Sequence, residues 1–113
     1  MIHKDKRRTI YDWANGNFKS LKVVYVDEPI AIGDHYHKNK DEVFFLAVGH
    51  IKELVLGDKV KYNIDAPYVI NVPKNTYHKF ICIPGTIIFG GATERFDPQD
   101  EIKKDVGMRN TTP

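Results

Sequence analysis

The sequence has no long hydrophobic run. Its longest uninterrupted apolar stretch is Val43 to Val48, far short of the roughly 20 residues that a membrane-spanning helix needs. The N-terminal residues MIHKDKRR are charged, but no continuous apolar segment follows them, so a cleaved secretory leader is not expected. Because the sequence has neither a long apolar run nor a leader pattern, we do not expect a membrane among the partners of this protein.

The sequence also has little cysteine and little net charge. Cys82 is its single cysteine and cannot form an internal disulfide, which agrees with a reducing cytoplasm. The formal net charge of +2 is too small to indicate nucleic-acid binding by itself, and the one basic cluster, Lys4 to Arg8, is interpreted as a solvated terminus. We expect a cytoplasmic protein with no nucleic-acid partner.

What is present is ordinary for a small globular protein. The 113 residues include 42% hydrophobic and 28% charged residues, which is enough apolar surface for a single hydrophobic core. We expect one domain over residues 1–113, with its core at about 20–95 and flexible segments at 1–10 and 106–113.

Short segments with the composition of β-strands run through the chain and are separated by turn residues. Gly57-Asp58 is typical of a two-residue hairpin in which glycine supplies the positive φ angle, and Pro84-Gly85 separates another pair of strands. Asp97 followed by Pro98 predicts a short C-terminal helix. The strands are expected at 21–26, 30–37, 42–48, 51–56, 59–64, 68–72, 79–83 and 86–89.

Two of these expected strands differ in how many of their faces should be buried. Residues 59–64 alternate, with Val60, Tyr62 and Ile64 on one face, so the other face should meet solvent. Val43 to Val48 is apolar on both faces, which indicates cover by a second layer or by another subunit. We expect a homodimer on this basis, although a central strand beneath a loop would explain the same pattern.

His35 and His37 lie two residues apart in an expected strand, so their side chains project to the same face. Lys38 to Asp41 has the composition of a polar turn, after which Glu42 begins the next strand. If that hairpin folds back antiparallel, the Glu42 carboxylate lies near both imidazoles. A lone carboxylate is costly to bury among aromatic side chains, and coordination of a cation removes the penalty.

A fourth candidate ligand is His78. Pro73 and Asn75 predict a turn that delivers His78 to the start of another strand. Three imidazole nitrogens and one carboxylate oxygen suit a divalent transition metal ion such as Fe, Mn, Ni, Co or Zn. The metal ligands are therefore predicted to be His35, His37, Glu42 and His78.

This two-part spacing resembles that of the cupin superfamily. The first cupin motif, G(x)5HxH(x)3–4E(x)6G, fits from His35 through His37 and Glu42 to Gly49. The second motif, G(x)5PxG(x)2H(x)3N, fits at its proline and its histidine, which are Pro73 and His78. The resemblance covers residues from about 20 to 95, and the joint spacing is more specific than either half.

The sequence departs from the cupin pattern at four positions, none of which removes a ligand. Asn75 stands at the inner glycine, a mild change because asparagine tolerates the left-handed backbone conformation. Cys82 stands where asparagine is usual and is interpreted as a small core residue. Pro29 and Pro67 stand at the opening glycines of the two motifs.

The resemblance implies an all-β fold, an antiparallel β-barrel of the jelly-roll (cupin) type with the metal inside. The tail GGATERFDPQDEI resembles the ending of small cupins in nucleotide-sugar pathways, including the WxcM-like keto-sugar isomerases and epimerases and the cupin domain of capsule-synthesis reductases. This implies an enzyme that moves a proton beside the carbonyl of a small sugar-derived substrate, with the metal as Lewis acid. Some members use the barrel histidines as bases instead, and His35 or His78 would then be catalytic.

Two other functions fit the same ligands. An Fe(II)-dependent dioxygenase would bind substrate and oxygen at the positions of the ion that the protein leaves free. A metal-dependent module that binds a small molecule without turnover would need no further residues. Iron with oxygen uptake would favour the dioxygenase, and exchange of solvent deuterium into a keto-sugar nucleotide would favour the isomerase.

The remaining aromatic residues are expected to shape the barrel. Tyr11, Trp13 and Phe18 are expected to pack over one of its mouths. The residues expected to line the interior or to supply polar groups to it are Phe44, Phe80, Phe89, Tyr62 and Asn71.

Overall fold

The computed structural model describes residues 2–103, and the expected flexible segment 106–113 lies outside them. No helix in this range has the length and apolar character needed to cross a membrane. The elements are β1 (Ile2–Lys4), β2 (Thr9–Tyr11), β3 (Ser20–Tyr25), β4 (Ile30–Tyr36), β5 (Glu42–Val48), β6 (His50–Leu56), β7 (Lys59–Asp65), β8 (Tyr68–Val72), β9 (His78–Cys82), β10 (Ile87–Ala92), the 3-10 turn η1 (Pro98–Asp100) and β11 (Ile102–Lys103).

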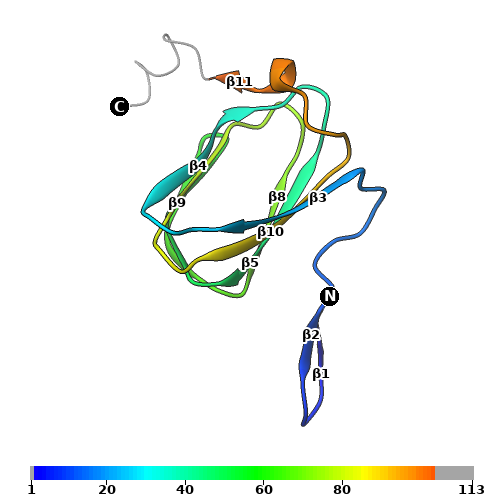
Figure 1. Ribbon diagram of the computed structural model, residues 1–113, viewed down its shortest axis with the longest axis vertical. Coiled ribbons are helices and arrows are strands. Elements are labelled where there is room, and N and C mark those ends of the chain that lie inside the picture. Colours follow the sequence, from blue (N-terminus) through cyan, green and yellow to red (C-terminus); the bar gives the residue numbers. More distant parts are fainter. Residues whose placement is uncertain (1, 104–113) are drawn as a thin grey trace.

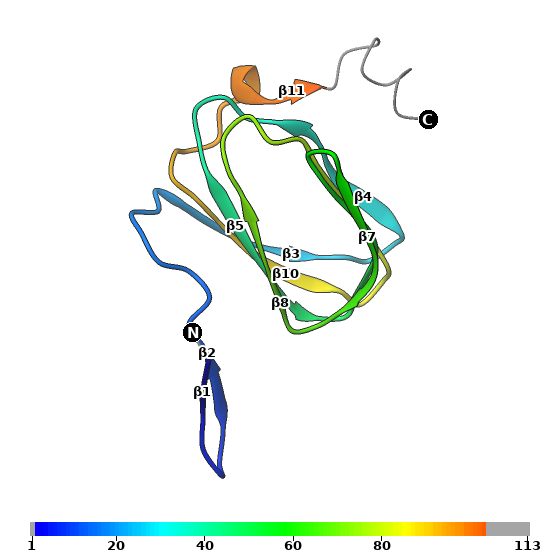
Figure 2. The same ribbon diagram turned by 180° about the vertical axis from the view of Figure 1, so that it is seen from behind.

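The strands form three antiparallel sheets. One larger sheet has the order β3-β10-β5-β8 and the other β11-β4-β9-β6-β7, and the two face each other (Figure 1). β1 and β2 pair only with each other and project from the body as a hairpin (Figure 2). Within residues 2–103 no strand pair joins the two larger sheets. The all-β antiparallel fold is as expected, but it is two facing sheets rather than one sheet closed by hydrogen bonds.

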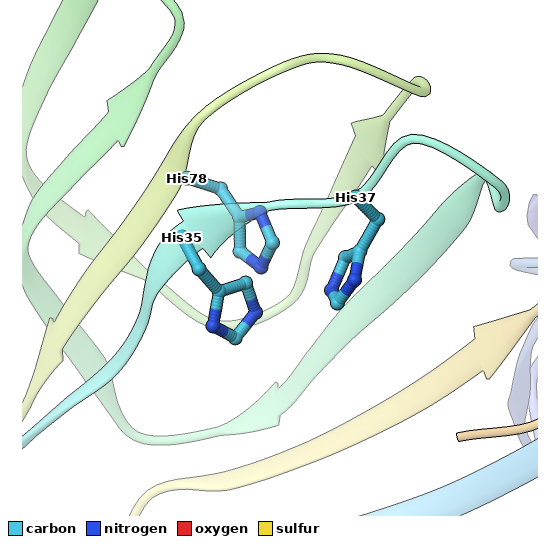
Figure 3. Close-up of side chains that lie close together, drawn as sticks. All are labelled: His35, His37 and His78. Atoms are coloured by element: carbon cyan, nitrogen blue, oxygen red, sulfur yellow. The ribbon is translucent and has the colours of Figure 1, made fainter. Parts of the chain in front are cut away.

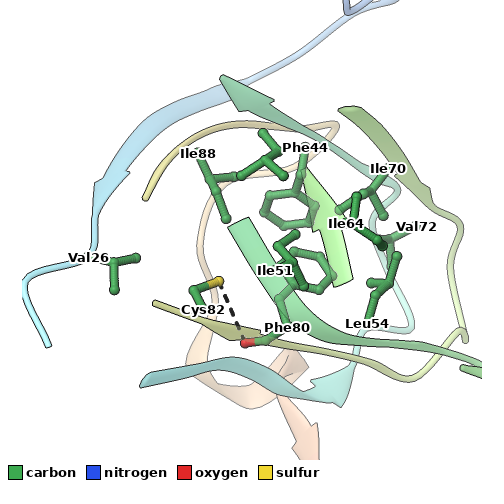
Figure 4. Packing of buried hydrophobic residues seen from close by; sticks show 11 residues of the cluster. Val26, Phe44, Ile51, Leu54, Ile64, Ile70, Val72, Phe80, Cys82 and Ile88 are labelled. Carbon is green, nitrogen blue, oxygen red and sulfur yellow. Dashed lines mark hydrogen bonds between the residues drawn. The ribbon is translucent and has the colours of Figure 1, made fainter. Parts of the chain in front are cut away.

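The hydrophobic core lies between the inner faces of the two larger sheets (Figure 4). Phe44 on β5 meets Phe80 on β9 edge to face, with ring centroids 5.0 Å apart. Each large side chain buried in this way contributes about 1.5–3 kcal/mol. The buried cluster consists of Val26, Phe44, Leu46, Ile51, Leu54, Ile64, Ile70, Val72, Phe80, Cys82 and Ile88.

The outer face of β5 is covered by the chain's own N-terminal segment. The rings of Tyr11 and Trp13 lie 5.4 and 6.0 Å from that of Phe45, and Trp13 also lies 6.4 Å from Phe89. The apolar pattern of Val43 to Val48 is thus explained within one chain, as a central strand beneath a loop. Trp13 covers the outside of a sheet rather than a barrel mouth, and Phe89 faces outward instead of lining the interior.

All eight strands expected from the sequence are present, with bounds that shift by at most three residues. Gly57-Asp58 joins β6 to β7, and Pro84-Gly85 joins β9 to β10, as expected. The expected C-terminal helix is the single turn η1, where the side chain of Asp97 accepts a hydrogen bond from the backbone N–H of Gln99. The short strands β1, β2 and β11 were not predicted, because two or three residues carry too little pattern.

β7 departs from the expected alternation. It pairs with β6 alone and forms the edge of its sheet. Ile64 is buried, but Val60 and Tyr62, which share its parity, are exposed. Tyr62 is therefore not a polar group of the interior, and Asn71 on β8 is exposed as well.

Gly33 lets β4 approach β9 closely where the histidines meet. Its φ is 90°, and a β-carbon added there would lie 2.7 Å from the carbonyl oxygen of His78 and 2.8 Å from Cδ2 of the His78 ring. Asp34, with φ of 66°, is the extra residue of a β-bulge between Gly33 and His35. The bulge sets His35 opposite His78.

Replacement of Gly33 by alanine is expected to lower the free energy of unfolding by about 2–4 kcal/mol, because strain at positive φ adds to a contact that the backbone must shift to relieve. Gly85→Ala is the matched control, since Gly85 has φ of 86° but no atom within 4 Å of the added carbon. About 1 kcal/mol is expected there. Denaturant unfolding measures both, and equal losses would mean that the approach of Gly33 to His78 is not a constraint.

Candidate functional site

The three predicted histidines come from neighbouring strands. His35 lies near the end of β4, His37 follows just beyond it, and His78 begins β9 opposite His35. Asn75, in the turn before β9, has φ of 62°, the left-handed conformation expected at the inner cupin glycine. Its N–H donates a hydrogen bond to the carbonyl oxygen of His37 at 2.6 Å, which ties the second motif to the first.

The three imidazole rings gather at one spot between the sheets (Figure 3). One nitrogen from each ring lies within 4.8 Å of those from the other two. The ring centroid of His35 lies 4.6 Å from that of His37 and 4.7 Å from that of His78. The side chains of His37 and His78 are buried, whereas 13% of the His35 side chain is exposed. His35 is therefore the ring most open to a ligand.

Glu42 reaches the same spot from the facing sheet, where it begins β5. Its Oε1 lies 3.2 Å from Nε2 of His37 and 3.6 Å from Nε2 of His78, and 3% of its side chain is exposed. The turn at residues 38–41 carries the chain from β4 to the facing sheet, so β4 and β5 do not pair as the expected hairpin would, yet Glu42 still lies beside His37 and His78. The structure thus brings the three predicted histidines to one spot and places Glu42 beside His37 and His78, and it is still a prediction that these four residues hold a metal ion.

The polar atoms of this cluster are incompletely paired. Within residues 2–103, Glu42 Oε1 and His78 Nδ1 are buried without a hydrogen-bond partner. His37 Nδ1 lies 2.9 Å from the carbonyl oxygen of Asp100, which can only accept, so this nitrogen carries a proton. Nε2 of a neutral His37 is then a lone pair facing a carboxylate. A shared proton or a cation between the two would stabilise that arrangement.

Burial keeps two of the imidazoles neutral. It lowers the pKa of His78 to about 4, although the Glu42 carboxylate partly opposes this shift. Burial also lowers the pKa of His35, and the charge of His37 adds to the effect. For Glu42, burial raises the pKa, but the adjacent His37 and His78 outweigh it, so the net pKa is lowered. Near pH 7 the site holds the Glu42 carboxylate together with neutral His35 and His78, whose nitrogens can accept a proton or bind a metal.

Two acidic residues that the sequence analysis did not select lie beside the histidines. The buried Asp100 carboxylate accepts hydrogen bonds from the backbone N–H groups of Lys38 and Asn39. Glu101 Oε1 lies 4.0 Å from Nδ1 of His35. The Asp97-Pro98 pattern indicated that a turn begins here, but no local pattern indicated that the turn would fold back onto the first motif.

Two further features lie outside the histidine cluster. Cys82 is in the core, and burial raises the pKa of its thiol to about 11, so the thiol stays protonated near pH 7. A cavity of about 390 Å³ lies beside the N-terminal segment, where Trp13, Phe18 and Asn71 contribute to its lining. Glu42 borders this cavity, but none of the three histidines does.

No protein-family model matches the sequence, and a search of curated proteins finds no match. Solved structures do match. A 3,4-ketoisomerase from Helicobacter canadensis has a TM-score of 0.76 and 19% identity over 98% of this chain and 91% of that chain. ChmJ, a 3'-monoepimerase from Streptomyces bikiniensis in complex with dTDP-quinovose, has a TM-score of 0.80. Its sequence is 12% identical over 100% of this chain and 70% of that chain.

A third match is the 3,4-ketoisomerase QdtA from Thermoanaerobacterium thermosaccharolyticum, with one histidine replaced by asparagine and in complex with TDP-4-keto-6-deoxyglucose. Its TM-score is 0.71, with 21% identity over 92% of this chain and 83% of that chain. At these identities the likeness concerns the fold alone, and the expected all-β antiparallel fold is confirmed. The chain has the fold that these sugar-nucleotide ketoisomerases and epimerases share.

Proposed function

We propose that this chain is a cytoplasmic isomerase or epimerase that moves a proton beside the carbonyl group of a keto-sugar nucleotide. The observation that carries the proposal is the cluster of three histidines at the centre of a fold shared with 3,4-ketoisomerases. Two of the similar structures hold TDP-linked sugars. The substrate class is accordingly a small keto-sugar joined to a nucleoside diphosphate.

The proposed reaction needs a group that removes a proton and a group that returns one. In a 4-keto sugar, the C3–H bond breaks and its electron pair forms the C3=C4 double bond of an enediolate. Protons added at C4 and on the C4 oxygen, with loss of the proton on the C3 oxygen, then leave the 3-keto isomer. No electrons are gained or lost overall, so acid–base groups are sufficient.

His35 and His78 are the residues to which we assign proton transfer. His35 is the most exposed ring, and its lowered pKa keeps the neutral form available near pH 7. The Glu101 carboxylate, 4.0 Å from Nδ1 of His35, would stabilise the imidazolium that forms. His78 is neutral, and its ring lies 4.7 Å from that of His35, so it is placed to exchange a proton with a substrate held at His35.

We also propose that His35, His37, Glu42 and His78 can hold one divalent metal ion, Fe, Mn, Ni, Co or Zn. The nitrogens, within 4.8 Å of one another, approach the roughly 3–4 Å between two imidazoles bound at about 2.1 Å to one ion. A cation would also give Glu42 Oε1 its missing partner. When bound, the ion would act as a Lewis acid on the carbonyl. A ring nitrogen that binds the ion cannot also accept a proton, so the two roles are alternatives.

Incubation with TDP-4-keto-6-deoxyglucose in D2O is expected to place deuterium on the sugar carbons beside the carbonyl and to yield the 3-keto isomer, as followed by proton NMR. His35→Asn is expected to lower kcat by roughly 10²–10⁴-fold, the usual contribution of a general base. His50→Asn is the control, because His50 pairs with Asp65 outside the cluster.

Absence of exchange across a panel of keto-sugar nucleotides would contradict the proposed activity. Oxygen uptake by iron-loaded protein in the same panel would favour the dioxygenase. Nucleotide-sugar binding without exchange or oxygen uptake would favour the binding module.

His37→Ala and His78→Ala are each expected to strip the ion and to lower Tm, because an ion that binds the folded state stabilises it by about 2.7 kcal/mol at 100 times its Kd. His3→Ala, in the exposed hairpin, is the control. Elemental analysis and thermal scans with and without chelator measure the effects. Full metal content and unchanged Tm in both variants would overturn the ligand assignment. If the parent protein takes up none of the five ions, the histidines act as acid–base groups and not as metal ligands.

We propose further that the chain forms a homodimer through the outer face of β3. Leu21, Val23 and Tyr25 alternate along this strand and are 73%, 42% and 67% exposed. Within residues 2–103, β3 pairs with β10 alone, so its other edge is free. An exposed apolar row at a free sheet edge is typical of a surface that another chain covers.

Light scattering is expected to give twice the 13.0 kDa mass of one chain. The double substitution Leu21→Lys and Tyr25→Lys is expected to give the single-chain mass, because charge on both sides of the interface would repel. Val60→Lys, on the exposed part of β7, is the control and should leave the dimer intact. A monomeric parent protein at micromolar concentration would contradict the proposal.

A further inference from the structure

The last described part of the chain returns to the histidines. After β10, η1 and β11 lie across the end of β4 (Figure 1). Ile102 pairs with Tyr36 and Lys103 pairs with His35. The C-terminal turn, residues 97–103, therefore lies against the segment that carries His35 and His37.

Asp100, in the C-terminal turn, binds this segment through both its backbone and its side chain. Its carbonyl oxygen accepts a hydrogen bond from Nδ1 of His37 at 2.9 Å. Its carboxylate accepts from the backbone N–H groups of Lys38 at 2.9 Å and Asn39 at 3.2 Å. Asp100 is 5% exposed, so water has little access to replace these bonds.

The first of these bonds fixes the state of the His37 ring. Because a carbonyl oxygen can only accept, Nδ1 must carry a proton, and Nε2 is the atom left for the site, 3.2 Å from Glu42 Oε1. The other two rings differ within residues 2–103. His78 Nδ1 makes no hydrogen bond of normal geometry, although the backbone of Thr76 interacts with this ring, and His35 Nδ1 is 4.0 Å from Glu101.

The carboxylate bonds hold that carbonyl in place. A carbonyl can orient a ring only if its own backbone is fixed. Asp97 begins the C-terminal turn by accepting hydrogen bonds from Gln99 N–H at its side chain and from Asp100 N–H at its carbonyl. The Asp100 carboxylate then anchors the turn to residues 38 and 39. Without it, the turn would be held against β4 by the short β11 pairing and by the bond to the His37 ring itself.

We infer that Asp100 is a positioning residue. Its carboxylate anchors the C-terminal turn, so that its carbonyl holds His37 with Nδ1 protonated and Nε2 directed at Glu42. A backbone acceptor of this kind sets the orientation and basicity of a functional histidine. The effect on turnover rests on the proposed function, but the state of the ring can be measured without any substrate.

The experiment compares Asp100→Ala with Asp100→Asn in the full chain labelled with ¹⁵N-histidine. In the parent protein the Hδ1 signal of His37, assigned by its loss in His37→Gln, is expected to be slow to exchange with solvent. Asp100→Asn keeps an acceptor oxygen and should keep this signal. Asp100→Ala should broaden the His37 Hδ1 signal, because the proton then exchanges faster with solvent. It should also lower kcat about ten- to hundredfold and leave KM within about twofold of the parent value.

Asp5→Ala is the matched control, since the Asp5 carboxylate also accepts bonds from two backbone N–H groups, but in the β1–β2 hairpin. It should change neither the His37 signal nor kcat. If Asp100→Ala does not fold, Asp97→Ala, which loosens the start of the turn, should shift the signal in the same direction.

An unprotonated His37 Nδ1 in the parent protein would overturn the inference, as would a protected Hδ1 in a folded Asp100→Ala or in its substitute Asp97→Ala. Absence of turnover in the parent protein would count against the proposed function and leave the NMR result to decide the role of Asp100.

Discussion

The burial of the Glu42 carboxylate against imidazoles from the facing sheet is the interaction on which the rest of the structure depends. A carboxylate that is 3% exposed costs several kcal/mol to bury unless charges or hydrogen bonds compensate. Here the pKa of Glu42 is lowered despite burial, because His37 and His78 lie beside it. The two sheets are thus held face to face by a polar contact as well as by the core of Phe44 and Phe80.

Several irregular backbone positions allow the histidines to reach the contact with Glu42. Gly33 has no side chain because the backbone of His78 occupies that space. Asp34 forms a bulge that turns His35 toward His78, and Asn75 adopts positive φ to bring the second motif against His37. Strain of this kind concentrates at functional sites, where the surrounding structure compensates for it.

The sequence was informative where the determining interactions are local. Alternation along β5 placed Glu42 with Phe44 and Leu46 on the inner face, and the spacing of His35 and His37 predicted that both rings point to the same side of the chain. These features depend on strand parity, which neighbouring residues fix. The three predicted histidines therefore meet in the structure with Glu42 beside two of them, although their occupancy by an ion is a proposal.

What the sequence did not reveal depends on contacts distant along the chain. The cover over Phe45 comes from Trp13, and the acceptor for His37 comes from Asp100, 63 residues away. Tyr62 is exposed although Ile64 is buried on the same edge strand, and Asn63 between them has a positive φ, which strand alternation alone cannot indicate. Sheet order and the return of the C-terminal turn are set by packing and not by local propensity.

The space between His37 Nε2 and Glu42 Oε1 decides which chemistry the site can perform. Because the Asp100 carbonyl fixes the ring proton on Nδ1, a neutral His37 would present a lone pair to a carboxylate 3.2 Å away. A proton in this space would make His37 and Glu42 a buried ion pair and leave neutral His35 and His78 for acid–base work. A metal ion there would instead take up those imidazole nitrogens as ligands. Since one nitrogen cannot serve both purposes, the occupant of this single space separates the two mechanisms.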